Sequence, residues 1–218
     1  MKFNIHEPIY KNIEKEVLGL SYNITFDDRQ LQVYSPRIAE IILRAATEIE
    51  SLAVELYYDA GGKAKNLSYK KAIDELEKYY KVKESAILVS FDNGYFSPQN
   101  SIIRPFDNWK KGESQDKTGR KILGGWDYAY QTIKHDKENN KYIAIQNYGT
   151  IRYAIWILSA LFYLNFIYSG SVKLAIVSDI FKIIQKNNNG KYGVWDKSVP
   201  ARYKDLDDIF SAILDAQK

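Results

Sequence analysis

Cysteine is absent from this 218-residue chain, and histidine occurs only twice, as His6 and His135. The lack of cysteine excludes disulfide frameworks and thiolate-ligated zinc, and it is compatible with a reducing compartment. Two histidines so distant in sequence would leave a metal site to depend mainly on carboxylates, and we expect neither a metal nor a cofactor. The N-terminal stretch MKFNIHEPIYKNIEKEV lacks the apolar centre of a signal peptide, which predicts a cytoplasmic protein.

The common catalytic signatures are also missing. There is no glycine-rich phosphate loop after a strand, no G-x-S-x-G, and no histidine pair at metal-binding spacing. The net charge is only +4, which permits a polyanionic partner without the concentrated basic patch of a dedicated nucleic-acid binder. Aromatic residues are abundant, with 18 Tyr, 9 Phe and 4 Trp. They serve both cores and binding surfaces, and composition does not separate the two roles.

Apolar residues recur every three or four positions over much of the chain, which predicts amphipathic helices. The clearest helix begins at Ser35 and Pro36, a capping residue followed by a proline in the first turn, and it ends at Gly61 and Gly62. Further helices are predicted at residues 7–18, 68–82, 126–138, 142–168 and 203–218.

The helix predicted at 142–168 contains the most apolar run of the chain, IRYAIWILSALFYLNFIY. Its central part, 151–167, is shorter than the ~20 residues that a membrane span needs. It also includes Arg152, Ser159 and Asn165. A helix that is apolar on all sides is equally expected at the centre of a helical bundle, and we favour that interpretation and expect no membrane association.

Two short extended runs interrupt the helical pattern. SAILVSF (85–91) and SIIRPF (101–106) are separated by turn residues, which predicts a small β-hairpin near 85–106. Residues 107–125 are interpreted as a polar, basic loop. The segment 171–186 fits either a strand followed by a helix or a helix throughout.

These elements predict a mainly α protein with a single domain over residues 1–218. Within it we distinguish an N-terminal extension (1–34), a helical core (35–168) that includes the hairpin and basic loop (85–125), and a C-terminal extension (169–218).

His135 is the leading candidate for chemistry. On a helix that begins at Trp126, the side chains of Ala129, Tyr130 and Ile133 share one apolar stripe, and His135 lies on the opposite side. An imidazole in that position can take or give a proton near neutral pH, and the neighbouring Lys134 and Lys137 could hold a phosphate. The alternative is a solvated or interface histidine.

Two stretches together resemble the HEPN-like helical bundles of prokaryotes: YSPRIAEIILRAATEIESLAVELYYDAG and FDNW…WDYAYQTIKHDKENN. The resemblance covers residues 35–168 and implies an often dimeric helical bundle. Many such proteins are metal-independent ribonucleases of toxin–antitoxin and phage-defence systems. In them an arginine, separated from a histidine by four to six intervening residues, helps to bind phosphate, while the histidine supports attack by the 2′-hydroxyl or protonates the leaving group.

The resemblance implies that His135 is the catalytic residue, but the arginine is missing. Tyr128, Ala129 and Tyr130 occupy the positions that would hold it. A lysine could supply the positive charge, although it does not present the two-pronged guanidinium fork. The candidate replacement cations are Lys134, Lys137, Arg120 and Arg152, and the expected substrate-binding residues are Lys134, Lys137, Tyr128, Asn139 and Arg152.

Three functional hypotheses remain open. The first is a protein that binds or cleaves RNA, a metal-independent or degenerate endoribonuclease with His135 as general acid or base. The second is a non-catalytic module of the same fold that forms a homodimer or binds an operon-encoded protein partner. The third is a small-molecule site in the aromatic-rich interior, which a large pocket would favour.

Overall fold

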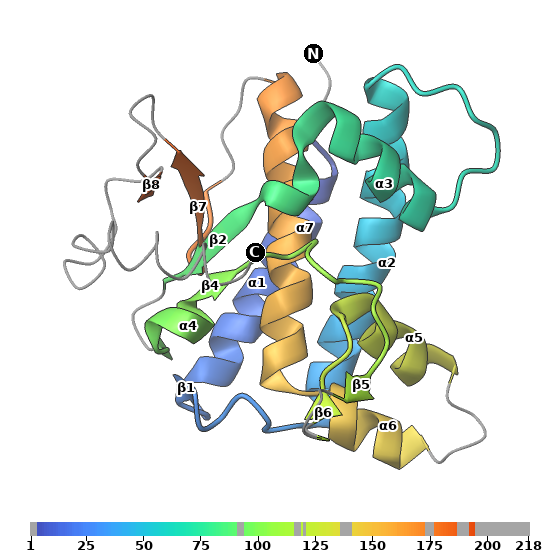
Figure 1. Ribbon diagram of the computed structural model, residues 1–218. Coiled ribbons are helices and arrows are strands. Elements are labelled where there is room, and N and C mark those ends of the chain that lie inside the picture. The colour runs from blue at the N-terminus through green and yellow to red at the C-terminus, as the bar shows by residue number, and fades with distance from the viewer. Residues whose placement is uncertain are drawn as a thin grey trace.

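Helix α7 (Ile151–Val172) runs through the middle of the molecule, and the other elements pack around it (Figure 1). The computed structural model describes residues 4–90, 94–115, 119, 121–135, 141–172, 177–186 and 192–194. Within these residues the protein is mainly helical with a small antiparallel sheet, as the sequence predicts.

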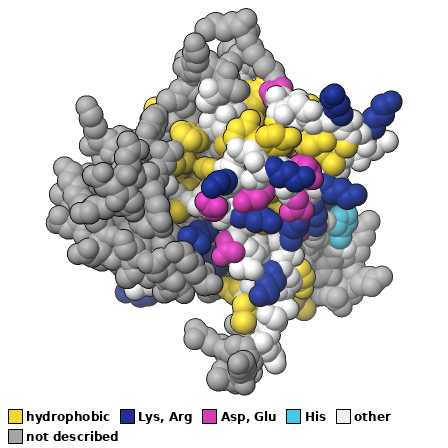
Figure 2. All heavy atoms as spheres, turned by 45° about the horizontal axis from the view of Figure 1, so that its top comes forward, with side chains coloured by type: hydrophobic (Ala, Val, Ile, Leu, Met, Phe, Trp, Pro, Cys, Tyr) yellow, Lys and Arg dark blue, Asp and Glu magenta, His cyan; other side chains and the backbone are white. Residues whose placement is uncertain are grey.

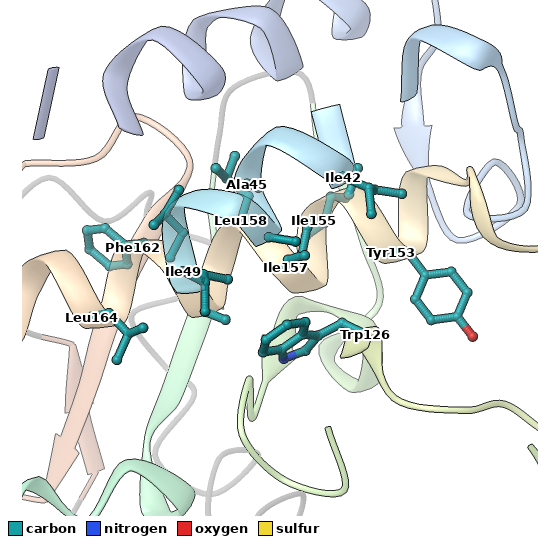
Figure 3. Packing of buried hydrophobic residues seen from close by; sticks show 14 of the residues in the cluster. Ile42, Ala45, Ile49, Trp126, Tyr153, Ile155, Ile157, Leu158, Phe162 and Leu164 are labelled. Carbon is teal, nitrogen blue, oxygen red and sulfur yellow. The ribbon is translucent and has the colours of Figure 1, made fainter. Parts of the chain in front are cut away.

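Helix α2 (Pro36–Asp59) is the main partner of α7, and its start and end follow the predicted signals. The Ser35 side chain accepts a hydrogen bond from the backbone N–H of Ile38 at 3.1 Å, and Pro36 opens the first turn. Beyond the helix, Gly61 adopts a positive φ of 89°, a conformation that glycine reaches without steric cost. Figure 3 shows the packed side chains of the two helices, among them Ile42, Ala45, Ile49, Leu158 and Phe162.

The other predicted helices within the described residues are present. Helix α1 (His6–Ser21) packs on both α2 and α7, and α3 (Tyr69–Tyr80) packs on α2. Helix α5 (Trp126–His135) begins where predicted, and the rest of its predicted length, 136–138, lies outside the described residues, as does the predicted helix 203–218. A 3-10 turn (Val82–Glu84) and the four-residue α4 (Pro98–Ser101) are additional.

The predicted hairpin forms part of a four-stranded antiparallel sheet in the order β4–β2–β7–β8. Strands β2 (Ala86–Val89) and β4 (Ile102–Ile103) pair with Ile87 opposite Ile103, which confirms the hairpin. On its other side β2 pairs with β7 (Phe181–Lys186), which in turn pairs with β8 (Tyr192–Val194). Two smaller pairings are β1 (Phe26–Asp27) with β3 (Gly94–Tyr95) and β5 (Ser114–Gln115) with β6 (Lys121–Ile122).

The C-terminal part of the sequence was predicted wrongly in one respect. Neither a strand followed by a helix nor a continuous helix describes 171–186, because α7 extends to Val172 and the strand β7 comes afterwards. The run FKIIQK contains no capping or periodic pattern strong enough to favour a helix, and it pairs instead with the buried strand β2. Similarly, the basic loop 107–125 contains the β5–β6 pair, which its polar composition did not indicate.

The single helix predicted at 142–168 is in fact two helices, α6 (Lys141–Tyr148) and α7, separated at Gly149 and Thr150. The backbone of the segment before α2 forms hydrogen bonds with the backbone groups at this break. Ser35 donates its N–H to the carbonyl of Gly149 at 3.1 Å, and the N–H groups of Ile151 and Arg152 donate to the carbonyls of Val33 and Leu31, each at 3.0 Å. Long-range pairing has therefore replaced the local helical hydrogen bonds.

Helix α7 is the buried central helix that we favoured over a membrane span. Within the described residues, Ile151–Gly170 is the one stretch long and apolar enough to cross a membrane by length and composition, and 72% of its apolar window is buried inside the protein. Its less buried side chains, Arg152, Trp156, Tyr163 and Phe166, lie along one seam.

His6, the second histidine of the chain, joins three helices. Its buried ring lies between the carboxylates of Glu48 and Glu55 on α2, with the Nε2–Glu55 distance at 2.8 Å, and its edge faces Tyr168 of α7. Tyr168 also donates to Glu55 at 2.6 Å. Only the imidazolium has two N–H donors for two carboxylates. Burial lowers the pKa of His6, but the hydrogen bonds and charges of Glu48 and Glu55 outweigh it and raise the pKa.

We predict that His6→Ala lowers the free energy of unfolding by about 3–5 kcal/mol at pH 6, because it removes one partner of a buried ionic group. A raised pKa in the folded state gives a contribution that is complete below the unfolded pKa and is lost as the pH rises through the folded pKa. Urea denaturation at pH 6 and pH 9 should therefore show a smaller difference from wild type at pH 9. The exposed His135→Ala is the control, and an equal cost of His6→Ala at both pH values would contradict the prediction.

Candidate functional site

The start of α5 is fixed by a close backbone contact with the preceding loop. The N–H of Gly125 donates to the carbonyl of Lys111 at 2.8 Å, and the N–H of Asp127 donates to that of Trp109 at 3.0 Å. A Cβ atom on Gly125 would lie 2.1 Å from the Trp109 carbonyl oxygen, so only glycine fits. Trp126 then stacks on Trp109, with ring centroids 4.8 Å apart, and it anchors the helix in the core.

His135 lies at the exposed end of α5, as the helical wheel predicts. Trp126, Ala129, Tyr130 and Ile133 are buried on the opposite side. Within the part of the chain that the structure describes, no hydrogen bond or ion pair engages the His135 side chain. It is accessible to a ligand or partner.

Lys134 is exposed and already has partners within the protein. Its ammonium donates to the Tyr130 hydroxyl at 2.6 Å and lies 3.9 Å from Glu50 of α2. The hydrogen bond with Tyr130 raises the pKa of Lys134, with a smaller contribution from the charge of Glu50. Two other expected substrate-binding residues, Lys137 and Asn139, lie outside the described residues.

Tyr128 is partly buried and packs against neighbouring residues. Its ring meets Tyr148 of α6 edge-on at 5.7 Å, and a Cβ atom on Gly124 would lie 2.7 Å from it. The neighbouring Asp127 is buried and accepts hydrogen bonds from Tyr69 and Lys70 of α3. This end of α5 therefore holds α3 and α6 in place.

Arg152 lies in a different place, in a pocket of about 420 Å³ that no residue of α5 lines. The pocket is formed by the start of α7, the segment around α4 and β4, the loop that follows β4, the end of the β5–β6 pair, and Leu31 of the segment before α2. Its polar lining residues are Gln99, Asn100, Arg104, Asp107, Asn108, Lys111 and Arg152, and its apolar ones are Leu31, Phe96, Ile102, Ile103, Ile122, Leu123, Ile155 and Trp156.

Three buried N–H groups in this lining lack an acceptor. The Nε atoms of Arg104 and Arg152 and the Nε1 atom of Trp156 have no hydrogen-bond partner among the residues that the structure describes. A buried donor without an acceptor costs about 1–3 kcal/mol, so native proteins rarely leave one unpaired. Three such unpaired donors in one pocket indicate that a group outside the described residues accepts hydrogen bonds from them.

The pocket is electropositive. Neither Arg104 nor Arg152 forms an ion pair with a carboxylate of the described residues. Burial lowers the pKa of Arg152, while the charge of Asp28 acts in the opposite direction. A guanidinium remains cationic at physiological pH even so. An anion entering here would meet two arginine forks that the described protein does not neutralise.

A second hollow, of about 530 Å³, lies between α1 and α2 and is lined by Pro8, Ile9, Asn12, Ile13, Leu43, Arg44, Thr47 and Glu48. Its two charged groups and Thr47 already have partners. Arg44 pairs with Glu16, Thr47 donates to the Leu43 carbonyl, and Glu48 holds His6. None of its lining residues holds a buried donor without a described partner, as Arg104, Arg152 and Trp156 do in the other pocket.

Sequence reasoning identified Arg152 but not Arg104 or Trp156. Arg152 and Trp156 are four residues apart within the apolar run 151–167, and this spacing places both on the same face of a helix. Arg104 gave no such signal, because its proximity to α7 depends on how β4 joins the sheet. The structure thus separates the expected site residues into α5 residues near His135 and Arg152 in the pocket.

We predict that the two tryptophans respond differently to replacement by phenylalanine. The Nε1 of Trp126 donates to the Pro105 carbonyl at 2.7 Å, whereas that of Trp156 has no described acceptor. Trp126→Phe should therefore lower the free energy of unfolding by about 1–3 kcal/mol more than Trp156→Phe. Urea denaturation followed by circular dichroism measures this, and an equal or larger cost for Trp156→Phe would contradict it.

Comparison with known proteins does not assign the site. No protein-family model matches the chain, and neither a curated protein nor a solved structure matches it. The function has to be argued from the pocket and from α5.

Proposed function

We propose that the protein binds a small anionic organic ligand in the pocket lined by Arg104, Arg152 and Trp156. The observation that carries the proposal is the set of three buried N–H donors, one from each of these residues, that lack an acceptor within the described chain. This is the small-molecule hypothesis, which a well-formed pocket favours.

The donors support an acceptor ligand, and their charge supports an anion. Two of the three belong to guanidinium groups, which donate to carboxylate or phosphate oxygens in paired, charge-assisted hydrogen bonds. Such bonds contribute about 1.5–3 kcal/mol each, more than bonds between neutral groups. A neutral ligand would leave both guanidinium charges uncompensated in a half-buried site.

The remaining walls support an organic ligand over a bare inorganic ion. Isoleucine side chains from β4, β6 and α7 line the pocket together with Leu31, Leu123, Phe96 and Trp156. A volume of about 420 Å³ lies within the usual range of small-molecule sites, which combine apolar walls with a few polar groups.

A second candidate function is the RNA-directed one, and the exposure of His135 favours it. An accessible imidazole at a helix end could serve as a general acid or base on RNA, as the resemblance to HEPN-like proteins implies. The metal-independent ribonuclease activity, the homodimer and the operon-encoded protein partner that follow from this resemblance stay predictions.

The surface charge gives this second candidate less support than the pocket gives the first. Figure 2 shows a face on which Lys and Arg side chains are intermixed with Asp and Glu side chains. Several of the lysines near α3 are neutralised in pairs, such as Lys78 with Glu75 at 2.7 Å and Lys110 with Asp74 at 2.6 Å. An extended RNA-binding surface usually presents a basic stripe.

We predict that benzoate or phenyl phosphate binds the wild-type protein and that Arg152→Leu weakens the binding by about tenfold or more, the loss of one charge-assisted contact. Isothermal titration calorimetry measures the affinity, and benzamide is the neutral control ligand. Arg44→Leu removes the same charge from the other hollow and should leave the affinity unchanged. Equal binding of benzamide, or an equal loss in both variants, would contradict the proposal.

For the second candidate, we predict that purified protein cleaves single-stranded RNA in the presence of EDTA and that His135→Ala lowers the rate by about 10²–10⁴-fold, the usual contribution of a general acid or base. Arg44→Leu, which removes a positive charge away from α5, is the control variant and should cleave RNA at the wild-type rate. RNA that stays intact with wild-type protein over a range of pH, or cleavage that persists in His135→Ala, would eliminate this role for His135.

A further inference from the structure

We propose that the ligand of this pocket is a phosphate monoester attached to an aromatic or heteroaromatic ring, bound as its dianion. This inference rests on the proposed anion-binding function and goes further by naming the chemical class. It is carried by the charge of the lining, the placement of the arginine forks, and the nature of the apolar wall.

The charge of the lining matches two negative charges. Arg104, Lys111 and Arg152 contribute three positive charges, and Asp107 contributes one negative charge, which leaves two positive charges. The Asp107 carboxylate already accepts a hydrogen bond from the Asn108 side chain at 3.1 Å, which reduces its repulsion of an anion. A carboxylate or a phosphodiester carries only one negative charge and would offset one of the two net positive charges of the lining, whereas a dianion would offset both. Asp28, outside the lining, acts on Arg152 alone.

The donors come from two directions. Arg104 follows β4 and Arg152 is in the first turn of α7, so the two guanidinium groups approach the pocket from different elements. Each has its buried Nε without a described acceptor, and Nε–H together with a terminal N–H forms one edge of the planar fork. One fork engages both oxygens of a carboxylate, so a second fork has to share them, whereas a phosphate monoester has a third terminal oxygen for the second fork.

Beyond the arginines, the wall suits a flat ring. Trp156 is half-buried and lies parallel to Tyr153, with an interplanar angle of 5°, so the position of its indole ring is fixed. Phe96, Ile103 and Ile155 supply further apolar surface, and the amides of Gln99 and Asn100 offer polar contacts for ring substituents. Aromatic rings bind to such surfaces through stacking and edge contacts.

The inference predicts a pH dependence that comes from the ligand. The second ionisation of a phosphate monoester has a pKa of about 6, so the dianion is lost as the pH falls from 8 to 5. The charged residues that line the pocket are Arg104, Lys111, Asp107 and Arg152, Asp28 acts on Arg152, and no histidine is among the described lining residues. Affinity for a monoester should fall over this range, whereas affinity for a phosphodiester or a carboxylate should change little.

The test is calorimetric titration of the full-length protein with phenyl phosphate, methyl phenyl phosphate, benzoate and inorganic phosphate at pH 8 and pH 5. We expect phenyl phosphate to bind about tenfold or more tightly than the other three at pH 8, the value of one additional charge-assisted contact. At pH 5 its advantage over methyl phenyl phosphate should largely disappear, because both are then monoanions.

Arg104→Lys and Arg152→Lys test the role of the forks, since they keep the charge and remove the planar donors. Each should lower the preference for the monoester over the diester, and Arg44→Lys should not. Circular dichroism at both pH values establishes that the variants are folded, and Trp156→Phe, which removes only one donor and keeps an aromatic ring, gives a second measurement of pocket binding if either arginine variant unfolds.

Four outcomes are decisive. Preference for phenyl phosphate that fades at pH 5 supports the inference. Equal affinity for benzoate, the diester and the monoester would overturn it while leaving the proposed anion-binding function standing. Inorganic phosphate that binds as tightly as phenyl phosphate would overturn the assignment of an aromatic body. No binding by any of these anions would overturn both the inference and the proposed function.

Discussion

Helix α7 is apolar around most of its circumference, so most of its surface has to be covered by other elements. This constraint organises the rest of the structure. Helix α2 covers most of one side, α1 and α5 cover others, and the strand β7 approaches from the sheet (Figure 1). Segments from both ends of the described chain thus depend on the same central helix. Two buried polar residues fix these segments: His6 ties α1 to α2 and α7, and Glu14 ties α1 to the residues before β7.

The enclosure is incomplete along one seam, and the pocket lies at its beginning. The break at Gly149 and Thr150 sets where α7 starts, because the segment before α2 uses the backbone N–H groups of the first turn. Leu31, which accepts from the Arg152 N–H, also lines the pocket. The same interaction that starts the helix therefore fixes the backbone of Arg152, and Trp156 follows one turn later on the same face.

The sequence predicted most elements that depend on local signals. The cap at Ser35 and Pro36, the stripe of α5 and the β2–β4 hairpin all follow from neighbouring residues. Features that depend on distant segments were missed: the break at Gly149, the strand β7, and the approach of Arg104 to Arg152. Each requires pairing between parts of the chain far apart in sequence, and periodicity contains no information on such pairing. His135 was placed correctly because the face of a helix is a local property.

The treatment of buried polar groups elsewhere in the protein strengthens the case for the pocket. Glu14 accepts from Tyr10, Lys11 and Asp179, and the buried Asp127 accepts from two side chains of α3. The chain thus satisfies isolated charges deep in its core, where desolvation costs most. Single buried atoms of Ser90, Trp109, Thr150 and Asn165 also lack a described partner, but none of these residues lines the pocket, whereas the three donors lie together in its wall. The three donors share one pocket, and two of them belong to cationic guanidinium groups. A ligand that satisfies them has to be negatively charged and has to carry oxygen atoms that accept hydrogen bonds.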